Sequence, residues 1–477
     1  MERYKYLFKN MGLLTLSSFA TKLISFILVP LYTNILSTTE YGIYDFFNTT
    51  IGVLLPLITL NIQESVMRFS MEKKTNKKSV ISIGIKYFFI GMVVFSCGLV
   101  INYFFEISSV IKDYAVCFWF MYMSQSLSGI VLSYARGADY IADLSLSSVG
   151  ATIIVITCNI LFLVVFKWGL LGYFWANIIG PLVQSLYIMI RTDIFNSLRS
   201  VKVLCKKDEK GMLNYCRPMI ANSIAWWVNN SSDRYVIIFF CGLAENGIYS
   251  VASKIPSILN IFQSIFAQAW ALSAVRDFDA KDEMGFFSNT YKAYNCFMVI
   301  MCSGIIVLNK ILAKFLFAKE FYMAWKYVPW LSIAIVFGAL SGYIGGFFSA
   351  VKNSKIFAQS SIIGAIVNIL LNLIFTPIMG ALGAAIATTI CYFVTWVVRF
   401  YHSKRFIKLN INLKRDYLSY GVLVAQAIYW LNCESTILTY AVQIVLFGLI
   451  ILLYSREIFQ NIKKITINLK DKILLNK

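Results

Sequence analysis

The pentapeptide Glu40-Tyr41-Gly42-Ile43-Tyr44 occurs a second time, with one substitution, as Glu245-Asn246-Gly247-Ile248-Tyr249. The two copies are 205 positions apart, and the same offset aligns polar residues inside the apolar flanks. These aligned pairs are Asp45 with Ser250, Thr59 with Ser264 and Gln63 with Gln268. A chance match would not keep polar register over some fifty residues, so we interpret the pattern as an internal duplication.

Composition places the chain in a membrane. Of its 477 residues 59% are hydrophobic and only 14% are charged, whereas soluble domains carry about 25% charged residues. A helical span needs about 20 mostly apolar residues. Hydropathy predicts an all-α polytopic membrane protein with about fourteen spans, at 10–34, 41–65, 80–104, 114–136, 145–166, 170–191, 215–241, 246–272, 288–308, 326–350, 356–376, 382–401, 417–432 and 436–455.

The distribution of Lys and Arg predicts the orientation. Loops on the side of the N-terminus hold 32 of these residues and loops on the opposite side hold 6. Because basic loops stay in the cytoplasm, both termini are expected there. The net charge of +20 then requires no nucleic-acid partner, although the basic loops could also contact anionic lipid head groups.

Two further repeats define the halves. Leu127-Ser128-Gly129 matches Leu340-Ser341-Gly342, and Gly169-Leu170-Leu171-Gly172 matches Gly380-Ala381-Leu382-Gly383. Six spans separate the mates, so the halves should share one orientation. The predicted parts are an N-lobe at 1–192, a linker at 193–214, a C-lobe at 215–402, and two extra spans with a basic tail at 403–477.

Charged and polar residues inside the spans are candidates for a transport path. Lys22 lies about 18 Å from the cytoplasmic end of its span at 1.5 Å per residue, beyond the reach of its side chain to the surface. Such a lysine must face water, a partner or a ligand; the alternatives are a substrate contact and a structural pair with a carboxylate.

A polar helical face from Asp45 to Gln63, with Pro56 in it, points to a water-filled cavity or to contacts between helices. Glu64 and Arg68 are spaced as an ion pair.

The duplicate hairpin carries the same kind of residues. Spans seven and eight hold more polarity than lipid tolerates, and the residues that we select from them are Asn222, Asn230, Asp233, Arg234, Lys254 and Gln268.

The two hairpins resemble those of the bacterial O-antigen and capsular polysaccharide flippases, members of the multidrug/oligosaccharidyl-lipid/polysaccharide exporter superfamily. The similar segments are Lys22-Leu23-Ile24-Ser25-Phe26, Glu40-Tyr41-Gly42-Ile43-Tyr44, Asp233-Arg234-Tyr235 and Lys254-Ile255-Pro256. The resemblance implies two six-helix lobes around a central cationic cavity in the bacterial cytoplasmic membrane. It implies a substrate of undecaprenyl-pyrophosphate-linked oligosaccharide, moved from the inner to the outer leaflet by alternating access, with membrane lipids, a polymerase and chain-length machinery as further partners.

The candidate residues suit that substrate. Lys22, Lys254 and Arg234 can neutralise a pyrophosphate, while amide side chains can bind sugars; these are Asn222, Asn230, Gln63 and Gln268. Asp45 or Asp233 is the candidate carrier if an ion gradient drives transport. No cofactor or metal is expected.

The sequence leaves three alternative functions, two of which it supports less well than a polysaccharide flippase. A drug/cation antiporter of the same superfamily would favour carboxylates over the intramembrane Lys and Arg found here. A membrane polymerase would need a large outer loop, and the predicted outer loops are short. The sequence also contains no nucleotide-binding loop and no nucleophile–base pattern of an enzyme. A lipid II flippase is not distinguished by these patterns.

Overall fold

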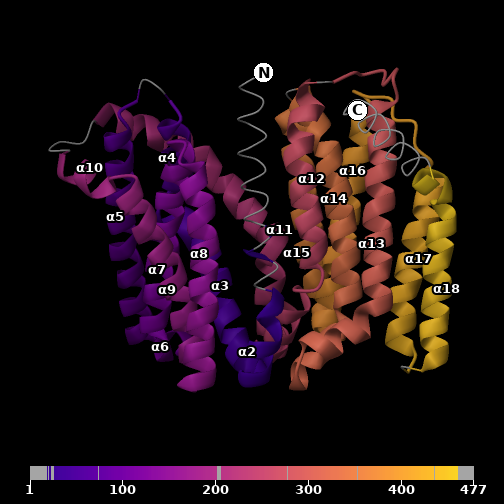
Figure 1. Ribbon diagram of the computed structural model, residues 1–477, viewed down its shortest axis with the longest axis horizontal. Helices are drawn as coiled ribbons and strands as arrows, with labels where there is room; N and C mark the ends of the chain where they lie inside the picture. The colour runs from indigo at the N-terminus through magenta and orange to yellow at the C-terminus, as the bar shows by residue number, and fades with distance from the viewer. Residues whose placement is uncertain are drawn as a thin grey trace, which may run out of the picture. The chain divides into compact units, whose positions relative to one another are not determined.

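The computed structural model describes residues 19, 21–22, 26–72, 75–200, 206–276, 278–351, 353–434 and 436–459. No strand occurs among them. Nine of the described helices are long and apolar enough to cross a membrane, or ten if the bent pair α3 (Thr38–Ile58) and α4 (Ile62–Ser70) counts as one span. The predicted all-α polytopic class is confirmed (Figure 1).

The chain forms two compact units. The first comprises the described residues up to Tyr235 and Leu243–Gly247. Besides α3 and α4, its elements are α2 (Val29–Ile35), α5 (Lys77–Phe105), α6 (Ser109–Asp113), α7 (Ala115–Gly137), α8 (Ile141–Asn159), the π-helical turn η1 (Ile160–Val165), α9 (Gly169–Arg191), α10 (Ile194–Ser200) and most of α11 (Lys206–Ala252).

The second unit comprises Val236–Gly242 and the described residues from Ile248 onward. Its further elements are α12 (Ser257–Arg276), α13 (Phe286–Leu316), the 3-10 helix η2 (Lys319–Lys326), α14 (Val328–Ala350), α15 (Ser354–Met379), α16 (Ala381–Ser403), α17 (Leu413–Asn432) and α18 (Ile437–Leu453). The units divide within α11, later in the chain than the linker at 193–214. The lobe boundaries drawn from the duplication stay a prediction.

Helix packing repeats from one unit to the other. In the first unit, α7 packs against α4, α5 and α9, and α9 packs against α8. In the second, α14 packs against α12, α13 and α16, and α16 packs against α15. Each helix of the first set corresponds in chain order to a helix of the second, so the same three-dimensional unit is built twice.

Matching glycines perform the same task in both units. A Cβ added at Gly172, near the start of α9, would lie 2.9 Å from the Cβ of Phe162. A Cβ added at Gly383, near the start of α16, would lie 3.0 Å from the Cβ of Phe375. In each case glycine lets a helix begin directly against the end of the preceding one. The repeated Gly-x-x-Gly pattern therefore marks a tight helix–helix corner.

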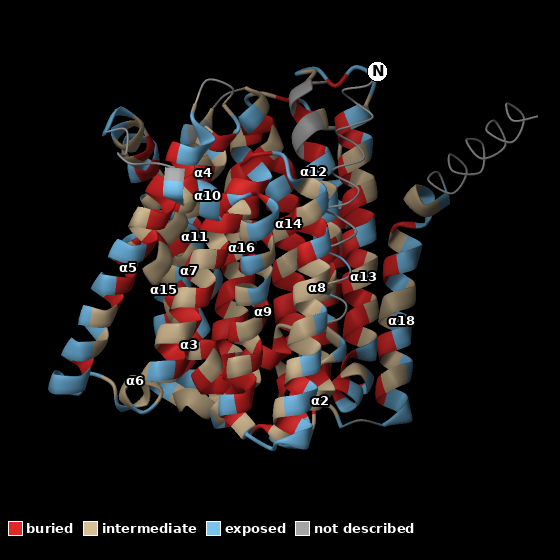
Figure 2. Ribbon diagram, turned by 60° about the vertical axis from the view of Figure 1, so that its left-hand side comes forward, coloured by how far each residue is buried: buried red, intermediate tan, exposed pale blue. Residues whose placement is uncertain are grey.

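Of the nine described helices that could cross a membrane, α14 in the second unit is the most enclosed. In the apolar 18-residue stretch of α14, 78% is buried, whereas 28% is buried in the corresponding stretch of α5. Figure 2 shows the exposed residues along α5 and α18. A helix that is apolar all round fits a position surrounded by other helices, which explains why α14 has no polar face.

Three expectations need correction. The second predicted span is bent by 64° between α3 and α4, because Leu60 and Asn61 adopt left-handed backbone conformations shortly after Pro56. The eighth is interrupted at Ser253–Pro256, between α11 and α12. Arg68 pairs with Glu72 rather than Glu64, at 3.3 Å. Hydropathy windows do not detect such breaks, since a bent apolar segment has the same composition as a straight one. Most of the first predicted span, 10–34, lies outside the described residues.

Candidate functional site

Polar contacts join α11 to α3 and α4 along much of their length. Near the start of α11, Ser65 Oγ donates to the carbonyl of Met212 at 2.7 Å. Where α3 bends into α4, Asn61 Nδ2 donates to Ser223 Oγ at 3.0 Å. Cys216 Sγ lies 3.3 Å from the carbonyl of Asn61. The left-handed Asn61 is thus held by the facing helix.

The same helices are joined further along α3. Trp227 Nε1 donates to the carbonyl of Thr49 at 2.9 Å, and Thr50 Oγ1 lies 2.6 Å from the hydroxyl of Tyr235. Here the backbone of Thr49 and the side chain of its neighbour Thr50 join α3 to α11. Contacts between helices thus continue along this part of α3.

The strongest of these contacts is an ion pair. Arg234 Nε lies 2.9 Å from Asp45 Oδ2, and the two side chains are 19% and 9% exposed. Asn246 Nδ2 donates to the same oxygen at 3.2 Å and to the carbonyl of Gly42 at 3.3 Å. A carboxylate, a guanidinium and an amide so form one buried group, in which the two charges compensate each other.

The two copies of the pentapeptide touch each other beside this group. A Cβ added at Gly42 would lie 3.3 Å from the backbone nitrogen of Gly247 and would overlap the carbonyl oxygen of Leu243. A Cβ added at Gly247 would lie 3.0 Å from the nitrogen of Gly42 and would overlap the carbonyl oxygen of Thr38. Because Thr38 and Leu243 are also related by the 205-residue offset, the contact is reciprocal, as in a two-fold interface.

The other residues of the first copy shape the local fold. Glu40 forms a capping box with Ser37 at the start of α3, which satisfies two backbone donors. Tyr41 stacks on Tyr32 with ring centroids 4.9 Å apart, and Tyr44 meets Tyr173 of α9 at 4.6 Å. Conformation and packing thus account for every polar or aromatic residue of the motif.

Replacing Gly42 with alanine is expected to cost about 1–3 kcal/mol, since the added methyl group must displace backbone rather than a flexible side chain. The measurement is the thermal unfolding midpoint of the purified full-length protein. Gly98→Ala is the matched control, because no atom lies within 4 Å of a Cβ added there. Equal midpoints for the two variants would contradict the close backbone contact.

The structure brings two of the predicted site residues, Asp45 and Arg234, into direct contact. Asp233, which precedes Arg234 in the sequence, is buried, and its Oδ1 accepts from the backbone nitrogen of Arg234 at 2.9 Å. Gln63 is half-buried against α7, where its Oε1 fills the space beside Gly129. That position was predicted to face a cavity, and the bend before α4 has turned it toward a neighbouring helix.

The remaining candidates are more open to their surroundings. Lys22 is exposed, and no ion pair formed by the described residues includes it. Lys254, in the break before α12, is half-buried. Asn222, Asn230 and Gln268 are exposed. Lys22, Asn222 and Asn230 belong to the first unit, and Lys254 and Gln268 belong to the second.

Sequence reasoning missed Asn246 as a member of the buried group. The signal was present, since Asn246 is the one residue that differs between the two pentapeptides. Tyr41 in the first copy packs on tyrosines, whereas Asn246 at the matching position binds Asp45.

A model of the family described as polysaccharide biosynthesis protein matches residues 7–272. The chain belongs to this family. The protein named "Probable low-salt glycan biosynthesis flippase Agl15" of Haloferax volcanii is 21% identical over 237 residues. That alignment spans 49% of the chain and about half (50%) of the length of the relative.

Solved structures of transporters have a similar fold. Lipid II flippase MurJ in an inward closed conformation has a TM-score of 0.69 at 17% identity, over 94% of this chain and 98% of that one. An inward-facing multidrug resistance MATE transporter of the MOP superfamily has a TM-score of 0.61 at 13% identity, over 82% and 95%. At these identities the likeness concerns the fold alone.

Proposed function

We propose that this family member is a flippase that moves a lipid-linked oligosaccharide between the leaflets of a membrane, by alternating access and without a covalent step. The observation that carries the proposal is the family match over 7–272, in a chain of which 94% aligns with the structure of a flippase. The finer proposal is an undecaprenyl-pyrophosphate-linked O-antigen or capsule repeat unit in the bacterial cytoplasmic membrane.

The accessible candidates suit such a substrate. Lys22 and Lys254 supply ammonium groups for a pyrophosphate, and exposed amides supply donors and acceptors for sugars. We include Arg234 among the residues that bind the pyrophosphate. To do so, its guanidinium must leave the carboxylate of Asp45, which breaks a buried ion pair.

A leaflet-resolved assay tests the proposed activity. Deletion of the gene is expected to leave the lipid-linked oligosaccharide in the inner leaflet, and the full-length protein restored from a plasmid should return it to the outer one. An unchanged leaflet distribution in the deletion strain would contradict the proposal.

A lipid II-type flippase is the second candidate, favoured by the TM-score of 0.69 to MurJ over 98% of that chain. The same deletion strain separates the two, because a lipid II flippase would change the leaflet distribution of the peptidoglycan precursor instead. An antiporter of drugs and cations, as in the MATE neighbour, would leave both lipids unchanged and alter drug efflux.

Ion coupling is a separate part of the proposal. If a proton or sodium gradient drives transport, Asp233 or Asp45 is the expected carrier. Asp45 is engaged by Arg234 and Asn246, so Asp233→Asn is expected to reduce gradient-dependent transport with less loss of folded protein than Asp45→Asn. Transport that survives collapse of both gradients, with both variants active, would rule out the coupling.

The proposed orientation is tested by cysteine labelling. In a background without the native cysteines, a cysteine introduced at 193–199 should react with an impermeant reagent only after the cells are opened, and one at 319–325 should react in intact cells. The reverse pattern would overturn the cytoplasmic placement of both termini.

A further inference from the structure

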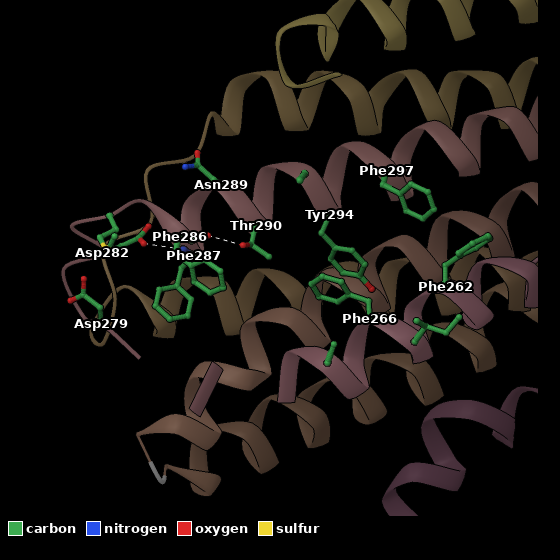
Figure 3. A pocket seen from close by; sticks show the side chains of 14 residues that line it. Phe262, Phe266, Asp279, Asp282, Phe286, Phe287, Asn289, Thr290, Tyr294 and Phe297 are labelled. Atoms are coloured by element: carbon green, nitrogen blue, oxygen red, sulfur yellow. Dashed lines mark hydrogen bonds between the residues drawn. The ribbon is translucent and has the colours of Figure 1, made fainter. Parts of the chain in front are cut away.

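A groove runs between α12 and α13 in the second unit, with a volume of about 1100 Å³. Figure 3 shows the side chains of both helices that line it. Its lining on α13 extends from Phe286 to Phe297, or about 16 Å at 1.5 Å per residue. Pockets for small molecules measure about 300–1,000 Å³, so this elongated groove is large enough for a chain-like ligand.

The walls of the groove are aromatic. Phe266 of α12 stacks on Tyr294 of α13 with ring centroids 3.8 Å apart, and Phe262 meets Phe297 edge-on at 5.2 Å. Phe286 and Phe297 are 44% and 40% exposed. Since α13 is apolar enough to span a membrane, an aromatic groove along it favours a hydrocarbon chain.

The polar end of the groove is acidic. Asp279 and Asp282 are the two charged residues among those that line it. Backbone N–H groups of Glu283 and Lys281 lower the pKa of Asp279, so this carboxylate is negatively charged at neutral pH. Asp282 accepts from the backbone nitrogens of Phe287 and Ser288 at 2.9 and 2.8 Å.

Basic residues lie near this end but do not line the groove. Lys281 is 3.7 Å from Glu283 and strongly exposed, and the backbone of Lys408 donates to the carbonyl of Ala280. A ligand in the groove therefore meets carboxylates first. An ammonium group is attracted to such an end, and a pyrophosphate is repelled.

We propose that the groove between α12 and α13 binds a phospholipid with an amine head group, its acyl chain along the aromatic walls and its ammonium beside Asp279 and Asp282. This site goes beyond the proposed function, because the lipid is bound and not transported. The acidic end excludes the pyrophosphate-linked substrate from the same position.

Native mass spectrometry of the full-length protein, released from detergent micelles, tests the site by counting retained lipids. The probes are phosphatidylethanolamine and phosphatidylglycerol with identical acyl chains, and undecaprenyl phosphate. We expect phosphatidylethanolamine to be retained up to about fivefold better than phosphatidylglycerol, as for an ion pair at a partly exposed site. Asp279→Asn should reduce that preference.

Two alanines of α12 provide a matched pair of variants. Ala269 lines the groove and Ala267 does not, and both are exposed. Ala269→Phe should fill the groove and remove the retained phosphatidylethanolamine, while Ala267→Phe should keep it, with equal unfolding midpoints. Three outcomes would overturn the assignment. They are equal retention of phosphatidylethanolamine by the two variants, retention of phosphatidylglycerol at least as good as that of phosphatidylethanolamine, and displacement of phosphatidylethanolamine by undecaprenyl phosphate. Because no transport is measured, these outcomes are independent of the flippase proposal.

Discussion

Replacing Asp45 with alanine is expected to lower the free energy of unfolding by about 3–5 kcal/mol, the usual cost of removing one partner of a buried ion pair. Arg234 would keep its charge at a site where its side chain is 19% exposed, with the facing carboxylate gone. The measurement is denaturant unfolding of the purified full-length protein in a fixed detergent. This is the largest stability effect that we expect from a single substitution in the chain.

A second ion pair of the same unit is the control. Arg191 Nε lies 2.8 Å from Asp143 Oδ1, but the arginine side chain is 57% exposed. Arg191→Ala should therefore cost at most about 1 kcal/mol. The double variant Asp45→Ala with Arg234→Met should recover part of the loss. Together with the single variants Asp45→Ala and Arg234→Met, it completes the cycle that gives the coupling energy of the pair. If Asp45→Ala and Arg191→Ala had equal small effects, the buried pair would not stabilise the fold.

The amide of the same buried group should matter less. Side-chain hydrogen bonds between membrane helices average about 0.6 kcal/mol. Asn246→Ala, which removes one donor to Asp45, is thus expected to fall well below Asp45→Ala in the same unfolding series. The charge, rather than the number of contacts, dominates this site.

Replacing Lys22 with glutamine or alanine is expected to reduce transport of the lipid-linked oligosaccharide by about tenfold or more. A hydrogen bond to a charged group contributes about 1.5–3 kcal/mol, and each 1.4 kcal/mol is a factor of ten. Lys22→Arg should keep partial transport, because it retains the charge. Transport must be normalised to folded protein in the membrane.

The alternative for Lys22 is a structural pair with a carboxylate, which predicts a loss of folded protein instead. The exposed position of Lys22 favours the substrate contact. Lys281→Gln, at an exposed position of a loop, is the control for loss of one positive charge. Wild-type transport by a well-folded Lys22→Gln variant would contradict the role of Lys22 in binding.

Most of the helical framework could be predicted from the sequence. Each predicted span from the second to the fourteenth coincides with a described helix or with neighbouring helices. The reason is that insertion into hydrocarbon depends on local composition over about 20 residues, and backbone groups there must bond within the segment. The duplication could also be recognised in the sequence, because both copies need glycine at the same tight helix–helix contacts, as at Gly172 and Gly383.

The partners of polar residues could not be predicted in this way. Asp45 was a candidate ion carrier and Arg234 a candidate for substrate binding; the tertiary structure places them 2.9 Å apart. Gln63 followed the helical period of its span, yet the bend of 64° before α4 turned it onto α7. Local patterns by themselves determined where helices form and that they form twice, because hydrophobic burial acts within each segment. Only the tertiary structure decided which charges compensate each other and which polar side chains remain available to a ligand, because those distances depend on how segments far apart in the chain pack.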